Sequence, residues 1–240
     1  MFNKKNKIKF FSIDEKIPNS LCPKPASLSL PDWYKNQEPY NTKDKKNIDG
    51  QIPKATIKRC IPIFDSITSG YIIFSTVDIY ITQKNGNPFF HWPISIDDDI
   101  PPIDFHENDQ FSQHPKFKNL PNLPKFVNPW VIKTPNGYSC FITSPMHREL
   151  PFEILPGIVD TDNYSVPVQF PFYLKDQKWE GMIPSGTPIA QVIPFKREDW
   201  KMDNTITKED IEKSKKDMFL LKMRFFSRYK KNFWKRKNFT

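Results

Sequence analysis

Glycine and cysteine are scarce in this sequence. Seven of the 240 residues are glycine, and the three cysteines, Cys22, Cys60 and Cys140, lie far apart. No C-x-x-C pair occurs and the number of cysteines is odd, which excludes a zinc knuckle and a disulfide framework of the usual kind. Free cysteines are typical of a reducing compartment, so we expect a cytoplasmic protein.

Long apolar runs are also missing. Asp65, Gly70 and Asp78 interrupt the most apolar stretch, residues 61–81, whereas a transmembrane helix needs roughly 18 or more apolar residues in succession. The apolar patch in the basic N-terminus, MFNKKNKIKFFSIDEK, is too short for a secretory signal. We therefore expect no transmembrane segment.

Proline, by contrast, is abundant. The 24 prolines make up twice the average share of about 5%, and proline breaks helices and is confined to the edges and starts of strands. This excludes a helix bundle or a coiled coil for most of the chain. Runs rich in Ile, Val, Phe, Tyr and Thr predict β-strands at residues 57–64, 71–82, 130–133, 138–144, 166–172 and 189–195.

Turn signals separate these runs. Asn85-Gly86 and Asn136-Gly137 predict tight β-hairpins. Residues 94–129 are rich in proline and contain the acidic run 97–99, which predicts a long surface excursion. Strands spaced by such turns are typical of an antiparallel sandwich or a small barrel-like β fold.

The sequence predicts three regions. Residues 1–55 form an irregular N-terminal arm with a polar loop at 41–50, residues 56–204 form the β domain, and residues 205–240 form a basic amphipathic helix and tail. Acids follow the N-cap candidate Thr207, where they favour the positive end of the helix dipole. Met218, Leu221 and Phe225 recur at helical spacing, so we expect this stripe to dock on the β domain.

The positive charge is concentrated at the C-terminus. Residues 208–240 hold 12 Lys or Arg and 4 Asp or Glu, and so carry +8 of the net charge of +9. Aromatic residues are interleaved there with Lys and Arg, a pattern that suits phosphate backbones, an anionic lipid surface or a partner protein, and equally a solvated helix face. The candidate polyanion-binding residues are Arg228, Lys230, Lys231, Lys235, Arg236 and Lys237.

The sharpest candidate for a ligand site is the turn Pro156–Tyr164, PGIVDTDNY. Of its two acids, Asp160 and Asp162, one can activate a water and the other can bind Mg²⁺ through water. Tyr164 can stack on a flat ring, and Arg148 can pair with phosphate. The alternative is structural: the two acids cap a turn and the tyrosine packs in the core.

This turn and the later segment GTPIAQVI resemble two consecutive motifs of the dUTP pyrophosphatases and the related dCTP deaminases. Ser69-Gly70-Tyr71 resembles an upstream motif of that family more loosely. The resemblance implies a β-clip fold, with Asp160 as the water-activating base, Tyr164 as the residue that stacks on the base, and Gln191 as a pocket residue. It also implies Mg²⁺ as a cofactor if the chain hydrolyses nucleotides.

Three features of that family are changed or absent. Asn163 stands between the second acid and the tyrosine, the R-S-G phosphate-binding motif is missing, and a basic helix replaces the glycine-rich tail. The resemblance therefore supports the fold more strongly than the activity.

A second resemblance extends over more of the chain. Four segments between Leu30 and Arg197 resemble a family of tailed-phage and bacterial proteins with no assigned activity: LPDWYKN, TIKRCIPIFDSITSGY, NPWVIKTPNGYSCFITSP and GTPIAQVIPFKR. This resemblance implies a phage provenance, with the host cytoplasm as the location, rather than a mechanism.

Two functions follow as alternatives, so enzymatic activity stays open. The favoured one is a phage-type accessory or structural protein, a non-enzymatic β scaffold whose basic tail anchors it to nucleic acid, an anionic surface, a virion protein or a second copy of itself. The other is a dUTPase-like nucleotide-binding protein or nucleotide hydrolase. Apart from the Mg²⁺ of that alternative we expect no cofactor, and the four scattered histidines predict no metal site.

Overall fold

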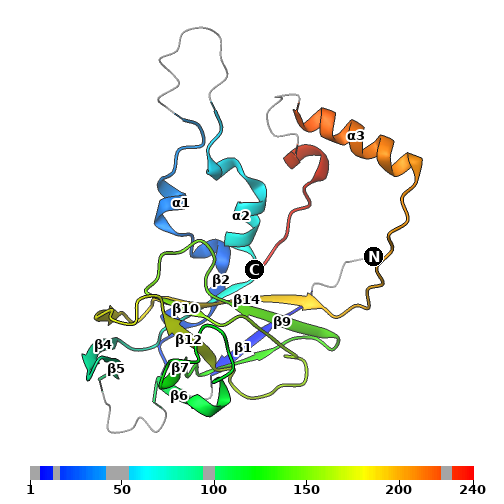
Figure 1. Ribbon diagram of the computed structural model, residues 1–240. Coiled ribbons are helices and arrows are strands. Elements are labelled where there is room, and N and C mark those ends of the chain that lie inside the picture. Colours follow the sequence, from blue (N-terminus) through cyan, green and yellow to red (C-terminus); the bar gives the residue numbers. More distant parts are fainter. Residues whose placement is uncertain (1–5, 13–16, 42–53, 94–100, 223–228) are drawn as a thin grey trace. The chain divides into compact units, whose positions relative to one another are not determined.

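A computed structural model of the protein describes residues 6–12, 17–41, 54–93, 101–222 and 229–240. Within these ranges the chain is mainly antiparallel β with a C-terminal helix (Figure 1), as the sequence predicts. The described strands number fourteen and form four sheets. The strands are β1 (Lys9–Ser12), β2 (Lys24–Pro25), β3 (Tyr71–Phe74), β4 (Ile79–Lys84), β5 (Asn87–His91), β6 (Ile103–Glu107), β7 (Asn122–Phe126), β8 (Trp130–Lys133), β9 (Tyr138–Thr143), β10 (Phe152–Ile154), β11 (Gly157–Val159), β12 (Phe170–Leu174), β13 (Gly181–Ile183) and β14 (Pro188–Lys196). The helical elements are α1 (Asp32–Asn36), α2 (Ile61–Thr68), α3 (Lys208–Lys222), the 3-10 helices η1 (Asn19–Leu21), η2 (Ala26–Leu28), η4 (Ile57–Arg59) and η5 (Asn108–Gln110), and the π-helical turn η6 (Tyr229–Phe233).

The chain divides into two compact units. The first comprises residues 1–31, 67–197 and 239, and it contains all fourteen described strands. The second comprises residues 32–66, 198–238 and 240, and it contains α1, most of α2, and α3. This division differs from the three expected regions because residues 32–66 group with the C-terminal segment and the expected arm contributes β1 and β2 to the first unit.

Alternating side chains build the core of the first unit. In β12 the buried residues are Phe170, Phe172 and Leu174, while the residues between them are only half-buried. Phe172 stacks on Phe126 of β7 with ring centroids 4.0 Å apart. Complete burial of one such side chain contributes roughly 1.5–3 kcal/mol, so these strands hold the unit together through apolar packing.

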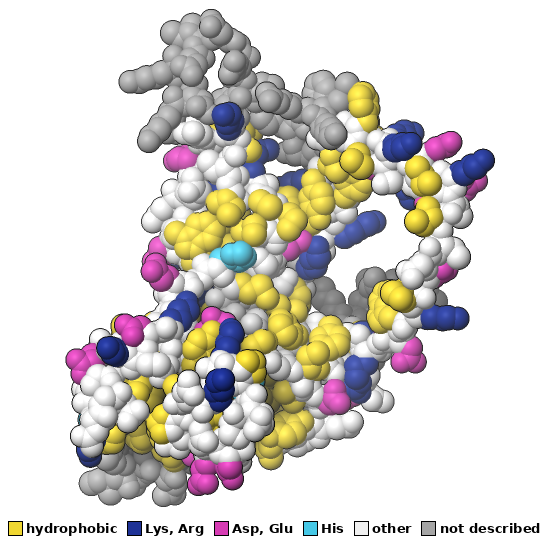
Figure 2. Space-filling view, viewed as in Figure 1, with side chains coloured by type: hydrophobic (Ala, Val, Ile, Leu, Met, Phe, Trp, Pro, Cys, Tyr) yellow, Lys and Arg dark blue, Asp and Glu magenta, His cyan; other side chains and the backbone are white. Residues whose placement is uncertain are grey.

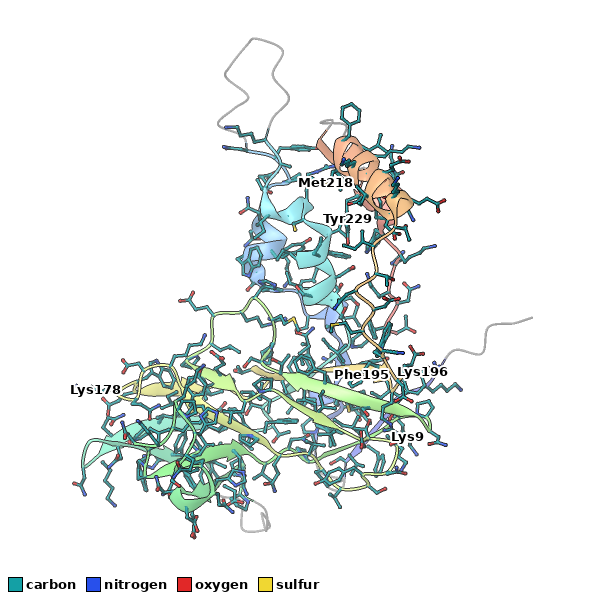
Figure 3. The ribbon with its side chains drawn as sticks, turned by 45° about the vertical axis from the view of Figure 1, so that its right-hand side comes forward. Lys9, Lys178, Phe195, Lys196, Met218 and Tyr229 are labelled. Carbon is teal, nitrogen blue, oxygen red and sulfur yellow. The ribbon has the colours of Figure 1, made fainter. Side chains whose placement is uncertain are left out.

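Strand β14 lies at the centre of the largest sheet, whose order is β11-β9-β14-β3-β2. It pairs with β9 on one side and β3 on the other, both antiparallel, and Phe195 and Lys196 mark its end in Figure 3. Gly70, just before β3, has a φ of +73°, and a Cβ there would lie 2.0 Å from the carbonyl oxygen of Val192. Only glycine therefore fits this close approach to β14.

One of the two expected hairpins forms. Asn85 and Gly86 both have positive φ, 53° and 77°, and join β4 to β5 in the two-residue turn that such angles favour. The expected hairpin at Asn136-Gly137 is wrong. Gly137 does turn the chain with a φ of +83°, but β8 pairs with β1 and β9 pairs with β11 and β14.

Three further expectations are wrong in detail. Residues 57–64 form η4 and the start of α2 rather than a strand, because Pro62 is tolerated in a first helical turn and Ile63, Phe64 and Ile67 recur at helical spacing. Residues 71–82 divide into β3 and β4, which belong to different sheets. The expected surface excursion contains β6 and β7, which pair with each other. The acidic run 97–99 and residues 42–50 of the polar loop lie outside the described residues.

The C-terminal helix is described from Lys208 to Lys222. It begins after Thr207, whose hydroxyl accepts a hydrogen bond from the amide of Asp210 while the Asp210 carboxylate accepts from the Thr207 amide and hydroxyl. In the expected inward stripe, Met218 is 55% exposed and Leu221 48% exposed. Hydrophobic side chains lie among lysines over α3 in Figure 2, and Met218 is labelled in Figure 3. Phe225 lies outside the described residues.

Candidate functional site

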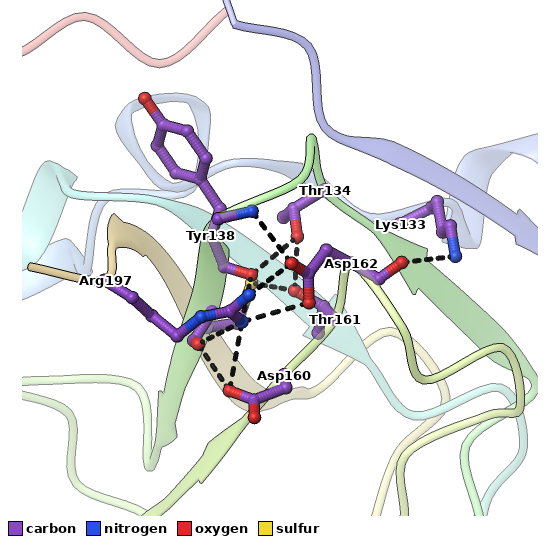
Figure 4. A network of polar contacts seen from close by, with 10 residues as sticks. Lys133, Thr134, Tyr138, Asp160, Thr161, Asp162 and Arg197 are labelled. Carbon is purple, nitrogen blue, oxygen red and sulfur yellow. Dashed lines mark hydrogen bonds and ion pairs between the residues drawn. The ribbon is translucent and has the colours of Figure 1, made fainter.

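Strand register brings the acidic turn against the end of β14. β11 pairs with β9, and Asp160 and Asp162 follow it in a turn in which the amides of Asn163 and Tyr164 donate to the carbonyl of Asp160. β9 also pairs with β14, with Tyr138 opposite Lys196. Arg197 directly follows β14, so this pairing places its guanidinium beside the two acids (Figure 4).

Asp162 forms a buried ion pair with Arg197. Its side chain is 2% exposed, and the guanidinium donates through Nη1 to Oδ1 at 3.0 Å and through Nη2 to Oδ2. The amide of Gly137 donates to Oδ2 at 2.8 Å. Both carboxylate oxygens therefore already have strong donors, as a stable buried charge requires.

The same donors set the protonation state of Asp162. The hydrogen bonds from Arg197 lower the pKa of this carboxyl to about 2, although burial acts in the opposite direction. An efficient general base has a pKa near the working pH. This geometry favours a structural part for Asp162 over proton transfer at neutral pH.

Asp160 is placed differently. Its side chain is 64% exposed, it accepts a hydrogen bond from the Ser139 hydroxyl at 2.6 Å, and it lies 3.2 Å from Arg197 Nη1. Arg197 thus bridges the two acids. Asp160 keeps one side open to solvent, so of the two it is the better placed to meet a ligand.

Small polar side chains pack beneath the turn. The Thr134 and Thr161 hydroxyls are 2.7 Å apart, and Thr161 donates to the sulfur of Cys140 at 3.3 Å. Cys140 is fully buried in β9, and burial raises the pKa of its thiol to about 11. A thiol held neutral in this way is a packing group and a poor nucleophile. Lys133 donates to the Asp162 carbonyl at 2.6 Å.

The other expected ligand residues lie in separate environments. Arg148 donates to the carbonyl of Ser29. The amide of Gln191, 1% exposed, accepts from the amide of Met146 at 2.9 Å and donates to the Ser69 carbonyl at 2.7 Å. Tyr164 is 43% exposed. Arg197 joins the side chains of Asp160 and Asp162, and the amide of Tyr164 donates to the Asp160 carbonyl.

Tyr164 lines a cavity of about 720 Å³ in the first unit. Val159, from the strand before the acidic turn, also lines it, whereas Asp160, Asp162 and Arg197 do not. The rest of the lining is mostly proline, valine and tryptophan, with four polar residues: Thr76, His106, Asn128 and Gln169. The acidic turn therefore adjoins a cavity whose wall does not include its carboxylates.

Apart from Phe239, the described part of the basic tail belongs to the second unit. Lys237 forms an ion pair with Asp65 of α2 at 2.5 Å, and the Trp234 indole donates to the same carboxylate. Lys230 lies over the Trp234 ring, 5.6 Å from its centroid. The exposed residues Lys231, Lys235 and Arg236 form no ion pair with any described residue. Arg228 lies outside the described residues.

No family model matches the sequence, and no curated protein gives a significant match. None of the described helices is both long and apolar enough to cross a membrane. In the described ranges no three His, Cys, Asp or Glu side chains gather closely enough to hold a metal ion.

Sequence reasoning missed Arg197, the residue that organises the acidic turn. It ends the segment GTPIAQVIPFKR directly after a strand. The missing signal was the pairing of β14 with β9, whose paired residues lie 48 (Gln191 and Thr143) to 58 (Lys196 and Tyr138) positions apart in the sequence. A single sequence does not encode that register in any local pattern.

Proposed function

We propose that the protein is a non-enzymatic β scaffold that binds nucleic-acid phosphates through its basic C-terminal segment. The observation that carries this proposal is the charge of residues 223–240, which contain seven Lys or Arg and no Asp or Glu. Lys231, Lys235 and Arg236 are exposed and form no ion pair with any described residue. Uncompensated cations of this kind bind phosphates and release counterions.

The aromatic contacts of the tail favour phosphates over a lipid surface. The Trp234 indole is hydrogen-bonded to Asp65 and half-buried, and Phe239 packs edge-on against Tyr71 with ring centroids 6.0 Å apart. Two aromatic side chains that could insert into a bilayer are thus engaged within the protein. Tyr229 and Phe233 are 42% and 39% exposed and could stack on unpaired bases beside the phosphate contacts.

The acidic turn supports the non-enzymatic part of the proposal. Asp162 is held by Arg197 and Gly137, and Gln191 spans two backbone segments, so both serve packing. A sandwich or β-clip arrangement and a phage provenance belong to the same proposal. The sandwich rests on the spacing of strands and turns in the sequence, and the β-clip and the provenance rest on the sequence resemblances.

A dUTPase-like nucleotide-binding protein is the second candidate, and it rests on two observations. Asp160 is 64% exposed, and Tyr164 lines a cavity next to the acidic turn. Incubation of the full chain with each dNTP and Mg²⁺ separates the candidates. Hydrolysis that Asp160→Asn abolishes would favour the enzyme, whereas no hydrolysis and no thermal shift would favour the scaffold.

The test of phosphate binding uses two variants with the same change of charge. One is the triple variant Lys231→Gln, Lys235→Gln, Arg236→Gln in the tail. The control is Lys213→Gln, Lys215→Gln, Lys216→Gln on α3, whose lysines are equally exposed. Affinity for a duplex DNA and for single-stranded DNA is measured across a salt series.

We expect the tail variant to lose affinity and salt dependence together. Each lost phosphate contact lowers the slope of log K against log salt by about 0.9 on duplex DNA. The α3 control should keep the slope of the unchanged protein. Absence of DNA binding at low salt, or equal losses in both variants, would contradict the proposal.

A further inference from the structure

The described wall of the cavity in the first unit carries no charge. None of the seventeen lining residues that the structure describes is Asp, Glu, Lys or Arg, although a quarter of the chain (26%) is charged. Its volume of about 720 Å³ lies within the range of ~300–1,000 Å³ that small-molecule sites occupy. Burial of a charged ligand against such a wall would leave that charge unpaired, which is costly. The cavity therefore suits a neutral molecule.

The lining is also largely apolar and rigid. Five prolines, five valines, Ile17, Trp92 and Tyr164 contribute to it. Proline rings and valines lose little conformational freedom on contact with a ligand, and apolar contact provides most of the affinity in sites of this size. We expect a ligand with an apolar body.

One polar side chain of the lining, His106, has a defined free acceptor. Gln110 Oε1 accepts a hydrogen bond from the backbone amide of Glu107 at 3.2 Å, so this atom is the carbonyl oxygen of the side chain. His106 Nδ1 lies 2.8 Å from the same oxygen and must therefore donate to it. The neutral imidazole then carries its lone pair on Nε2, and no described residue donates to that atom.

Asn128, another polar residue of the wall, offers less. It is 1% exposed, and its amide donates to the carbonyls of Val168 and Trp130 and accepts from the Trp130 amide. Its hydrogen-bonding capacity is used by the backbone. His106 Nε2, by contrast, is an acceptor of this wall that its neighbours define and that no described residue uses.

We propose that this cavity binds a small neutral molecule with an apolar body and one hydrogen-bond donor, which His106 Nε2 accepts. The site is separate from the basic tail, so it does not depend on nucleic-acid binding. The uncharged wall also distinguishes the ligand from a nucleotide, whose phosphates would have no counter-charge there.

Three related probes test the chemistry on the full chain. 2-Naphthol is neutral and has one donor, 2-methoxynaphthalene has the same ring without the donor, and 2-naphthoate carries a negative charge. Binding is measured by ligand-observed NMR titration up to about 1 mM, the concentration range of weak specific binding. We expect 2-naphthol to bind saturably and 2-methoxynaphthalene to bind roughly 2- to 12-fold more weakly, the contribution of one ordinary hydrogen bond.

Paired variants locate the binding. Val166 lines the cavity and is 51% exposed, so Val166→Asp places a charge in the wall at a position that tolerates a polar side chain. Ile158, 66% exposed and not part of the wall, provides the matched control Ile158→Asp. Val166→Asp should abolish saturable binding of 2-naphthol and Ile158→Asp should preserve it. His106→Leu should remove the preference for 2-naphthol over 2-methoxynaphthalene.

Four results would overturn the proposal. The first is a lack of saturable 2-naphthol binding. The second is equal binding by the Val166→Asp and Ile158→Asp variants, which would place the probe elsewhere. The third is a preference for 2-naphthol that persists in His106→Leu. Binding of 2-naphthoate that Val166→Asp weakens as much as that of 2-naphthol would contradict the requirement for a neutral ligand.

Discussion

The indole nitrogen of Trp234 donates a hydrogen bond to each carboxylate oxygen of Asp65, at 3.0 and 2.9 Å. Lys237 adds an ion pair to the same carboxylate at 2.5 Å. A single acid on α2 thus holds a segment 169 residues later in the chain. It also divides the tail cations into Lys237, which is paired within the protein, and Lys231, Lys235 and Arg236, which form no such pair with a described residue.

Asp65→Asn should loosen the C-terminal segment. The neutral amide loses the ion pair to Lys237 and one of its two acceptor oxygens. Hydrogen bonds to charged groups contribute about 1.5–3 kcal/mol each, so amide exchange in residues 229–238 should accelerate by at least about tenfold. Hydrogen–deuterium exchange followed by mass spectrometry measures this.

The control for that experiment is Asp32→Asn. Asp32 pairs with Lys35 on the surface, and its side chain is 86% exposed, so its loss should change little. Equal exchange rates for residues 229–238 in the Asp65→Asn variant and the unchanged protein would show that this contact does not hold the tail.

The two acids of the turn should differ in their contribution to stability. Asp162→Asn leaves the Arg197 guanidinium without its buried counter-charge and should lower Tm clearly. Asp160→Asn changes an exposed side chain whose contacts with Ser139 and Arg197 are open to solvent, and it should lower Tm less. Thermal unfolding of both variants at pH 7 checks the order. A larger loss for Asp160→Asn would mean that the ion pair of Asp162 is not the main stabilising contact of the turn.

Acid should destabilise the protein partly through Asp162. Its pKa in the folded protein is about 2, against an ordinary value of 3.8. A lowered pKa contributes stability that is complete above about pH 4 and is lost as pH falls toward 2. The free energy of unfolding should therefore fall more steeply between pH 4 and 2 in the unchanged protein than in Asp162→Asn.

The pKa values of the Asp104, Asp203 and Asp210 carboxyls are also lowered, so their contributions to the stability of the folded protein are likewise lost as pH falls. They are common to both proteins and cancel in the difference between them. Denaturant titrations at pH 5, 4, 3 and 2 provide the comparison. Parallel pH profiles would contradict the role given to the Arg197 ion pair.

Gly70→Ala should destabilise the first unit much more than Gly86→Ala. Both glycines have positive φ, so each alanine pays a similar conformational cost of about 1–2 kcal/mol. A Cβ at Gly86 meets nothing within 4 Å, whereas a Cβ at Gly70 would lie 2.0 Å from Val192 O. The difference between the two variants in the free energy of unfolding by urea therefore measures the cost of the steric clash with Val192. Similar losses would show that β14 can move away from residue 70.

Local patterns predicted much of the first unit. Residues 130–133, 138–144 and 189–195 coincide closely with β8, β9 and β14, because β-branched and aromatic residues there lie between clear turn signals. The same criterion failed at residues 57–64, where isoleucines lie at helical spacing around Pro62. Short apolar runs do not separate helix from strand by composition alone.

The site was predicted in part. The closeness of Asp160 and Asp162 follows from their two-residue spacing, and the exposure of Tyr164 agrees with an outward side chain. Gln191 and Arg148 were expected to face a ligand, but their partners, such as Ser69 and Ser29, come from distant segments. Those pairings arise from sheet register and loop packing, which no local pattern in one sequence reports.

The position of β14 has a consequence for the order of events during synthesis. Both of its neighbours, β3 and β9, leave the ribosome before it does, yet neither pairs with the other. One edge of each strand therefore stays unpaired until residues 188–196 are synthesised. Arg197 can then form its ion pairs with Asp160 and Asp162. Such late, non-local pairing slows folding and leaves strand edges exposed to association. Nascent chains that stop before residue 188 should therefore depend on chaperones far more than chains that extend past Arg197.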